Sequence, residues 1–371
     1  MRIGIDIRNL TQDLSGTSRY IYFLFKELLK INKNIYGFSP YKIKKEYFFK
    51  KKFYKNIIEG KFLKLNIFRF VWGLFFLKNQ IKKKKIDIFW GAAHRLPFNL
   101  PNNIIKVLTI FDLTFYKNPK SMNYFDLLKE YLLTPKSIKQ ADIIIVPSES
   151  TKKDLIEFDN TTKKKIKVIK LGNFFKKTKI KKNNNHFSNL YKPYLLFVGS
   201  VSPRKNLENF ICSFSKLPDY LQNNYNVVII GNLNYRKNNL KSLIREKKIE
   251  KSVFFMGKTP DKDLKFFYKN AEYLIFPSIR EGFGLPIVEA QSFGTPVIAS
   301  GTSSLPEVAG KQSIYFNPYS ITNMTKVLKS TLKNKSIRKK KSLELLKQQS
   351  RSWKITAIEL YKTITNFKKN V

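Results

Sequence analysis

Cysteine, histidine and acidic side chains are scarce in this 371-residue sequence, and each scarcity excludes a kind of site. The single cysteine, Cys212, excludes a disulfide within the chain and suits a reducing cytosol. The two histidines, His94 and His186, belong to no cluster of metal-ligating residues, and nothing resembles a Ser/His/Asp triad. We therefore expect no bound metal and no resident cofactor.

Negative charge is scarce too, with 26 Asp and Glu residues against 71 Lys and Arg residues, for a formal net charge of +45. An excess of this size is typical of proteins that bind nucleic acid or an anionic membrane. The lysines are scattered, however, and accompany many Asn, Ile, Phe and Tyr residues, as a drift in composition would produce. Drift and a selected anionic partner both stay open, because charge governs association rather than fold.

Long apolar runs are missing as well. The densest stretch, residues 65–77, is interrupted by Arg69 and is shorter than the roughly 20 apolar residues that span a bilayer. Residues 48–54 mix lysines with aromatic side chains, and four lysines follow at 82–85. Two interpretations stay open for residues 48–85: a basic, aromatic segment that docks on a membrane surface, or an ordinary helix packed on the core.

What is present describes a globular α/β protein. Apolar residues make up 43 % of the sequence, and its length allows two domains with full cores. Short apolar runs alternate with segments of helical period, with strands predicted at residues 1–7, 86–90 and 194–198 among others. This alternation indicates doubly wound parallel sheets. Because a strand opens the chain, we expect no signal peptide.

The most informative pattern lies in residues 273–300. An apolar strand ends at Pro277, and the glycines of residues 281–284 indicate a loop. A helix can begin at Pro286, and a second short strand follows at 297–299. The order strand, glycine-rich loop, helix, strand is a unit that can bind a ligand at its first turn.

Two carboxylates frame this unit. Glu281 lies at the strand end, where open α/β sheets bind ligands. Glu289 comes eight positions later, about two helical turns on, so its carboxylate can face the same crevice. The turn adds backbone donors for an oxygen-rich ligand, those of Gly282, Phe283, Gly284 and Leu285. A sugar that carries a diphosphate fits this set, whereas a tight turn with solvated glutamates is the alternative.

The spacing of Glu281 and Glu289 resembles the Glu-x7-Glu motif of the retaining glycosyltransferases of family four, which have the two-domain GT-B fold. Residues 260–264 and 304–308 are similar to the mannosyltransferase-like branch of that family. The resemblance is specific in the second half of the chain and weaker in the first.

The resemblance implies a domain organisation. It predicts an N-terminal, acceptor-side Rossmann-like domain at residues 1–180 and a C-terminal, nucleotide-sugar-binding Rossmann-like domain at residues 190–350. A last helix, within residues 351–371, is expected to pack back on the first domain, and the two domains are expected to face a cleft. The charged, Asn-rich residues 176–192 are predicted to form a linker or surface loop.

In the first domain, the resemblance places Gly16 and Thr17 in a glycine loop that faces the donor phosphates. Asp112 and His94 each follow a predicted strand, so both are expected at the ligand edge of the sheet. Family members usually carry His-Asp at positions 111 and 112, and Phe111 replaces that histidine here. His94 is the candidate to compensate, and a structural role for this loop histidine is the alternative.

In the second domain, Arg204 and Lys205 follow the strand at 194–198 and precede a helix. Cations at such a place can neutralise a diphosphate as it departs, although two solvated surface charges are the alternative. The text resembles the family's Pro-Arg-Lys-Asn variant. Many relatives carry an arginine at the place of Ser200, so Arg204 would supply that charge by a different route, and Lys205 is the surer match.

Together with these patterns, the resemblance implies a retaining, metal-independent glycosyltransferase that uses a nucleotide-diphospho-sugar, with GDP-mannose as one candidate donor. Glu281 and the amides after it would hold the sugar, Glu289 the ribose, and Lys205 with Arg204 the leaving diphosphate. A glycan or lipid-linked acceptor would be elongated in surface polysaccharide synthesis, in the cytoplasm or on the inner membrane face. The alternative is a basic nucleic-acid-binding protein or a non-catalytic GT-B-like protein, which leaves the carboxylate and glycine pattern unexplained. A GT-B phosphorylase or epimerase fits less well, because the chain is short and has no cofactor-lysine motif.

Overall fold

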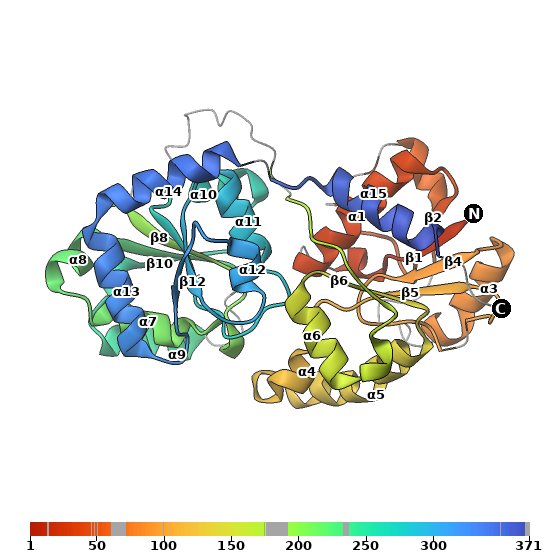
Figure 1. The fold of residues 1–371 in the computed structure, drawn as a ribbon, viewed down its shortest axis with the longest axis horizontal. Coiled ribbons are helices and arrows are strands. Elements are labelled where there is room, and N and C mark those ends of the chain that lie inside the picture. The colour runs from red at the N-terminus through yellow and green to blue at the C-terminus, as the bar shows by residue number, and fades with distance from the viewer. Residues whose placement is uncertain are drawn as a thin grey trace. The chain divides into compact units, whose positions relative to one another are not determined.

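The structure is a computed structural model that describes residues 1–12, 15–45, 47, 49, 51–60, 72–98, 100–173, 175, 192–232, 237–348 and 350–367. The chain forms two compact units (Figure 1). Unit 1 contains Met1–Gly172 together with Arg351–Val371, and unit 2 contains Asn173–Ser350. Of the linker that the sequence predicts, all but Lys192 lies outside the described residues.

Unit 1 is built on a seven-stranded sheet in which every neighbouring pair is parallel. The strand order is β3-β2-β1-β4-β5-β6-β7. Most of these strands are short apolar runs buried on both faces, as parallel strands between two layers of helices require. Their bounds are β1 Ile3–Asp6, β2 Ile35–Ser39, β3 Ile57–Glu59, β4 Ile88–Gly91, β5 Ile105–Thr109, β6 Ile143–Val146 and β7 Ile166–Val168.

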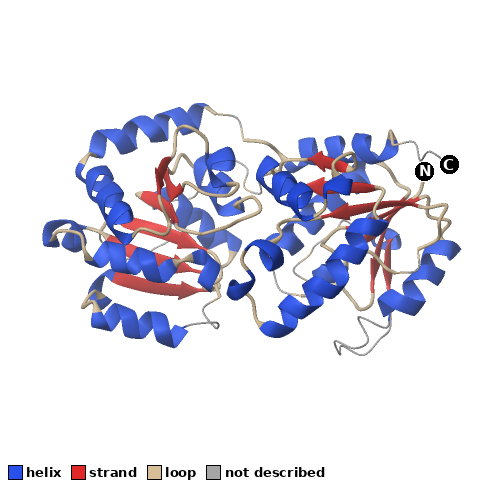
Figure 2. Cartoon of the chain, turned by 60° about the horizontal axis from the view of Figure 1, so that its bottom comes forward, coloured by secondary structure: helices blue, strands red, loops and turns tan. Residues whose placement is uncertain are grey.

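The helices of unit 1 lie on both faces of its sheet (Figure 2). α1 begins at Gly16, because the side chain of Ser15 accepts from the backbone of Ser18 and caps the helix. The helical period of the apolar residues in the sequence predicts a start at about Ser18, two residues later. The sequence offers Ser148 and Ser150 as candidate caps for the next helix, and in the structure Ser148 accepts from the Thr151 amide and opens α6. The helices are α1 Gly16–Ile31, α3 Leu77–Lys83, α4 Thr114–Lys117, α5 Tyr124–Gln140, α6 Glu149–Phe158 and α15 Trp353–Thr365.

The last helix, α15, belongs to unit 1 and packs against α1. The Trp353 ring stacks on Phe23 at 5.8 Å between ring centres and meets Tyr20 edge-on at 6.0 Å. Gly172 is needed for the close approach of the chain at the start of α15, since a Cβ there would lie 2.5 Å from the Trp353 amide nitrogen. The C-terminal residues therefore complete the core of the N-terminal unit.

Within the described part of residues 48–85, three aromatic side chains, Phe49, Phe53 and Trp72, are buried in unit 1, whereas Tyr54 and Phe76 are exposed. Phe49 is fully buried against Tyr22 and Phe25. A π-helical turn at Trp72–Phe76 leads into α3, and Trp72 and Leu77 are fully buried in the core. The core-facing interpretation is therefore confirmed for Phe49, Trp72 and Leu77, whereas Phe48, Lys50 and residues 61–71 lie outside the described residues. Among the described residues, no helix combines the length and apolar character that crossing a bilayer requires.

Unit 2 repeats the same architecture with a six-stranded parallel sheet, in the order β10-β9-β8-β11-β12-β13. Its core lies in two layers, one on each face of the sheet. The strands are β8 Tyr194–Val198, β9 Asn226–Ile230, β10 Val253–Gly257, β11 Tyr273–Phe276, β12 Val297–Ser300 and β13 Ile314–Phe316. The helices are α7 Leu207–Ser215, α8 Asp219–Asn224, α9 Lys237–Glu246, α10 Asp261–Asn270, α11 Leu285–Ser292, α12 Leu305–Ala309, α13 Ile321–Lys333 and α14 Lys335–Lys347.

Both sheets are doubly wound, as the alternation of strands and helices predicts. The strand order reverses direction next to β1 and β4 in unit 1, and next to β8 and β11 in unit 2. In open parallel sheets, ligands bind beyond the carboxyl ends of the strands at such a switch point. Apart from Asp112, which follows β5, the candidate residues follow these strands, which makes the two switch points the places to look for a site.

Candidate functional site

Three charged side chains meet at the switch point of unit 2. Lys205 Nζ lies 2.5 Å from Glu281 Oε1, and Arg204 Nη1 lies 2.5 Å from Glu281 Oε2. Lys205 and Glu281 are both buried, while Arg204 keeps about a quarter of its side chain exposed. The two cations follow β8 and the carboxylate follows β11, so the sheet brings together residues 76 and 77 positions apart. Two cations against one anion leave this cluster with a net positive charge.

The ion pairs control the protonation of Glu281. Burial by itself would raise the pKa of this carboxyl, but the charges and hydrogen bonds of Arg204 and Lys205 lower it to about 2. Glu281 is therefore ionised throughout the physiological pH range. A carboxylate held in this way accepts hydrogen bonds well and takes up a proton poorly.

Local backbone structure explains how Lys205 reaches its place. Residues Pro203–Lys205 form one 3-10 turn, which ends at Asn206 in the left-handed conformation with φ of 59°. The side-chain Nδ2 of Asn206 donates to the carbonyl oxygens of Pro277 and Pro318, at 3.2 and 2.9 Å. Asparagine tolerates this backbone conformation, and its side chain fastens the turn to the end of β11.

The loop after β11 is held from the other side by serines. The hydroxyls of Ser303 and Ser304 donate to the Glu281 carbonyl oxygen at 2.7 and 2.8 Å, and the Glu281 amide donates to Ser303 Oγ at 3.3 Å. Gly284 caps α11 with φ of 100°, a conformation that favours glycine. Glu281 thus sits in a loop fixed at both ends.

The helix after this loop is α11, which begins at Leu285, one residue before the predicted start at Pro286. The first backbone amides of a helix have no partner within it, and the helix dipole makes them suited to anions and hydroxyls. The backbone donors that the sequence predicts belong to the residues just before and at the start of α11, which are Gly282, Phe283, Gly284 and Leu285. Glu289 lies in the next turns of α11, is buried, and accepts a hydrogen bond from the Tyr268 hydroxyl at 2.7 Å. Its predicted role toward a ribose stays a prediction.

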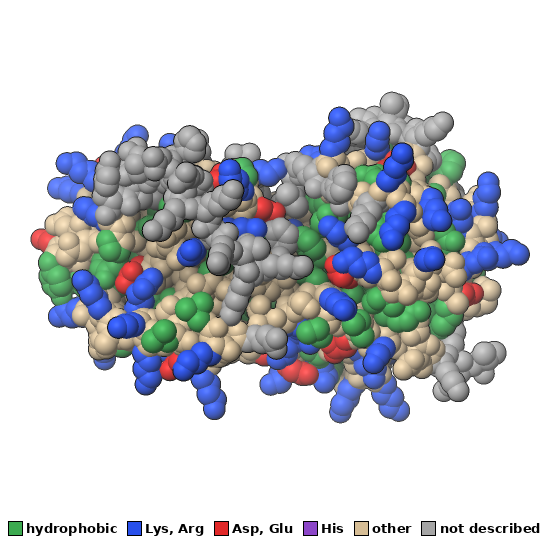
Figure 3. All heavy atoms as spheres, turned by 90° about the horizontal axis from the view of Figure 1, so that it is seen from above, with side chains coloured by type: hydrophobic (Ala, Val, Ile, Leu, Met, Phe, Trp, Pro, Cys, Tyr) green, Lys and Arg blue, Asp and Glu red, His purple; other side chains and the backbone are tan. Residues whose placement is uncertain are grey.

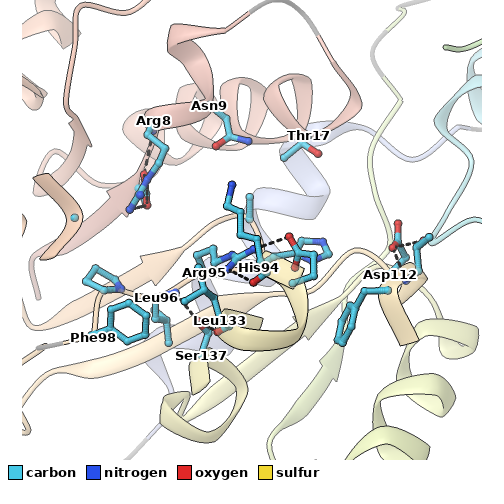
Figure 4. A pocket seen from close by; sticks show the side chains of 18 of the residues that line it. Arg8, Asn9, Thr17, His94, Arg95, Leu96, Phe98, Asp112, Leu133 and Ser137 are labelled. Carbon is cyan, nitrogen blue, oxygen red and sulfur yellow. Dashed lines mark hydrogen bonds and ion pairs between the residues drawn. The ribbon is translucent and has the colours of Figure 1, made fainter. Parts of the chain in front are cut away.

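Unit 1 has a pocket of about 860 Å³ at its own switch point. Its wall comes from the segments that follow β1, β4 and β5 and from the inner face of α5. In Figure 4, Arg8, Asn9 and Thr17 line one side, His94 and Arg95 lie on the other, and Asp112 lies farther along. The pocket mixes arginine, carboxylate, amide and hydroxyl groups with apolar side chains, a lining that suits a molecule rich in hydroxyls.

Two ion pairs set the charge of this pocket. Arg8 Nη2 lies 2.6 Å from Asp6 Oδ2, and its guanidinium stacks over the Trp72 ring. Arg95 Nη2 lies 2.6 Å from Glu130 Oε1 on α5. None of these four charged residues is predicted as a site residue from the sequence, although Asp6 and Arg8 stand directly at the end of the first predicted strand. That position at the ligand edge was the signal that could have identified them.

His94 and Asp112 both lie at this pocket, as predicted from their positions after strands. His94 has a left-handed backbone with φ of 56°, and its Nε2 accepts from the Phe111 amide at 3.2 Å. Its ring lies 5.7 Å from the Phe111 ring, so His94 is next to the position at which the resemblance predicts a histidine. Asp112 accepts from the amide and hydroxyl of Thr114, at 3.0 and 2.6 Å, at the start of α4.

Thr17 also lines the pocket, from the first turn of α1, and Gly16 precedes it there. The predicted glycine loop is thus a helix start in the structure, and Asp13 and Leu14 lie outside the described residues. In the part of the chain that the structure describes, no three His, Cys, Asp or Glu side chains come together as they would to hold a metal ion.

Two of the curated relatives that the sequence matches are O-antigen chain mannosyltransferases. The chain is 26 % identical over 251 residues to the O-antigen chain mannosyltransferase B of Escherichia coli, and the match covers 66 % of each chain. It is 29 % identical over 216 residues to the O-antigen chain mannosyltransferase RfbU of Salmonella typhimurium, and that match covers 57 % of each. These matches span less than two thirds of the relatives' own length.

Solved structures and a family model complete the comparison. The glycosyltransferase WaaG, involved in lipopolysaccharide biosynthesis, superposes with a TM-score of 0.76 at 15 % identity, over 98 % of this chain and 100 % of WaaG. Anabaena HepE, solved with UDP and glucose, gives a TM-score of 0.72 at 14 % identity, over 99 % of this chain and 100 % of HepE. This likeness shows the GT-B fold that the sequence predicts. The model of the glycosyl transferases group 1 matches residues 159–353, more than half of the sequence, and the chain belongs to this family.

Proposed function

We propose that this chain is a retaining hexosyltransferase that moves a sugar from a nucleotide-diphospho-sugar to a glycan or lipid-linked acceptor in surface polysaccharide synthesis. The cluster of Lys205, Arg204 and Glu281 at the switch point of unit 2 carries the proposal. It places positive charge beside the start of α11, where a diphosphate and the hydroxyls of a sugar can bind together. The two O-antigen mannosyltransferases among the relatives support the polysaccharide context.

The cluster supplies the main electrostatic requirement of the reaction. When the bond between sugar and diphosphate breaks, negative charge builds up on the departing phosphate. Lys205 and Arg204 are held in place by Glu281 before the substrate arrives, so little reorganisation is needed as that charge develops. These cations meet the charge that a divalent metal meets in other transferases, and we propose a metal-independent reaction on that basis.

The state of Glu281 bears on the stereochemical course. Both of its carboxylate oxygens are engaged by cations, and its pKa of about 2 makes it a poor base. A covalent nucleophile would have to leave these partners. We therefore favour front-face attack, in which an oxygen of the leaving phosphate helps to deprotonate the acceptor hydroxyl. Glu281 then orients the cations and accepts from the sugar hydroxyls.

The donor can be identified by thermal stabilisation. A ligand that binds only the folded state raises the melting temperature, by several degrees at about a hundred times its dissociation constant. GDP-mannose and UDP-sugars are the first to test, since relatives are named mannosyltransferases and HepE was solved with UDP-glucose. We expect one nucleotide sugar to stabilise the chain. Stabilisation by oligonucleotides alone would support the nucleic-acid alternative.

On the face that Figure 3 shows, the distribution of charge does not favour that alternative. Seen from above (Figure 3), the Lys and Arg side chains drawn in colour are spread over the face without gathering into one patch. A nucleic-acid-binding surface concentrates basic residues along a face or groove. The scattered pattern on this face is the one that compositional drift produces.

His94 provides a prediction on the acceptor side. Because Nε2 accepts from the Phe111 amide, a neutral His94 carries its proton on Nδ1 and can donate a hydrogen bond to a sugar. We expect His94→Asn, which keeps a residue that tolerates the left-handed backbone, to lower kcat/KM about tenfold. Transfer kinetics with His186→Asn as the control measure this. Unchanged kinetics in His94→Asn would leave His94 with a structural role only.

A further inference from the structure

The longest helix of unit 1, α5, exposes an apolar face. Five large side chains on it are exposed: Tyr124 by 71 %, Phe125 by 81 %, Leu128 by 44 %, Tyr131 by 46 % and Leu132 by 55 %. At about 100° per residue, these positions fall within an arc of about 120° along one side of the helix. Single exposed apolar residues are ordinary, whereas five on one face of one helix indicate a surface that something covers.

The opposite face of α5 is fastened to the pocket of unit 1. Ser137 accepts a hydrogen bond from the Leu96 amide at 3.1 Å, and Glu130 pairs with Arg95. Lys129, Glu130, Leu133 and Ser137 all line the pocket. Figure 1 shows α5 along the lower margin of this unit. The helix therefore connects an outer apolar surface with the wall of the pocket.

The charges beside the apolar face indicate what covers it. Lys136 and Lys139 are exposed on the same helix near the apolar arc, and the exposed Lys129 lies between this arc and the pocket. The helix has two acidic residues, Asp126 and Glu130, and Glu130 is paired with Arg95. Aromatic and aliphatic side chains bordered by lysines are the composition of helices that lie in the interface of an anionic bilayer. A single helix face is also small for a stable protein interface.

We propose that the outer face of α5, defined by Tyr124, Phe125, Leu128, Tyr131 and Leu132, docks on the surface of an anionic phospholipid bilayer. Docking brings the pocket that α5 lines close to the headgroup layer, where a lipid-linked acceptor would be presented. This second part rests on the proposed function, whereas docking itself does not. The surface differs from residues 48–85, whose described aromatic side chains are mostly buried.

Vesicle co-sedimentation tests the docking. Wild-type chain is mixed at low salt with vesicles of phosphatidylglycerol and phosphatidylcholine, or of phosphatidylcholine alone. We expect binding to the anionic vesicles, and a loss of at least tenfold in affinity for the double variant Phe125→Ser, Leu132→Ser. The double variant Lys136→Gln, Lys139→Gln should bind the anionic vesicles less tightly, and its affinity should depend less on salt concentration. The matched controls are Tyr319→Ser, an exposed aromatic residue of unit 2, and Lys82→Gln with Lys83→Gln on α3.

A fluorescent variant keeps the test independent of any folding defect. The three native tryptophans, Trp72, Trp90 and Trp353, are buried. In Phe125→Trp, the added emission should shift to the blue on anionic vesicles, and in Tyr319→Trp it should not. Wild-type chain that stays in the supernatant, or α5 variants that bind as wild type, would overturn the proposal. So would self-association through Phe125, seen as a dimer by light scattering, without vesicle binding.

A functional readout separates this proposal from the proposed function. Donor hydrolysis in water does not need a membrane, so the α5 double variant should retain it. If hydrolysis is absent in wild type while vesicles bind, the proposed function fails and the docking stands. If hydrolysis is present and vesicles do not bind, the docking fails alone.

Discussion

Lys205→Ala is expected to lower turnover by about a hundredfold or more, as loss of one preorganised contact to a developing charge commonly does. Lys205 Nζ is buried, lies 2.5 Å from Glu281, and stands 5.1 Å from the centre of the Phe276 ring, where few water molecules can screen it. Water therefore screens little of the interaction that its charge makes with a leaving diphosphate. Initial rates of sugar transfer at saturating donor measure the effect.

Two matched variants show whether the loss is specific. Lys216→Ala removes an exposed lysine at the end of α7 and should leave turnover unchanged. Arg204→Ala should cost less than Lys205→Ala, because Arg204 is partly exposed and water screens its charge. Wild-type turnover in Lys205→Ala, with the variant folded, would remove Lys205 from the mechanism.

Glu281→Gln is expected to abolish transfer while nucleoside diphosphate binding is retained or becomes tighter. The substitution removes the anion that orients the two cations and accepts from the sugar, but leaves both cations available to phosphate. We expect a loss in kcat/KM of at least a hundredfold, together with an unchanged or lower dissociation constant for the free diphosphate. Parallel loss of transfer and diphosphate affinity would contradict this division of roles.

The same variant has a predicted pH signature. Lowering of the Glu281 pKa from 4.5 to about 2 corresponds to a contribution of about 3 kcal/mol to the free energy of unfolding. A depressed carboxyl pKa gives stability that is complete above pH 4.5 and is lost as the pH falls toward 2. The difference in free energy of unfolding between wild type and Glu281→Gln should therefore be largest near neutral pH. It should decrease as the pH falls below 4.5. Denaturant unfolding at pH 7 and at several values between 5 and 3 measures it.

Short-range patterns in the sequence predict much of the fold. The strand at residues 273–276, the helix that begins near Pro286 and the cap at Ser148 are all observed, because each depends on local apolar period and local capping chemistry. The observed helix bounds differ by one or two residues, as at α1, where the Ser15 cap moves the start to Gly16.

Local sequence patterns do not predict contacts between residues that are distant in the chain. The sequence places Lys205 and Glu281 at the same sheet edge, but their direct pairing depends on β8 and β11 being neighbours and on Asn206 fastening the turn. The buried state of Phe49 likewise depends on its distant partners on α1. On α5 the period of apolar residues resembles that of a core helix, and only the packed structure shows that this face is outside.

The stereochemistry of the product tests the central claim most directly. Purified chain is incubated with the stabilising nucleotide sugar and an acceptor, and proton NMR reads the anomeric configuration of the new linkage. We predict that the sugar keeps the configuration it had in the donor, and that Lys205→Ala forms the same product at least a hundredfold more slowly. An inverted linkage, or transfer that proceeds unchanged without Lys205, would contradict the account of this site.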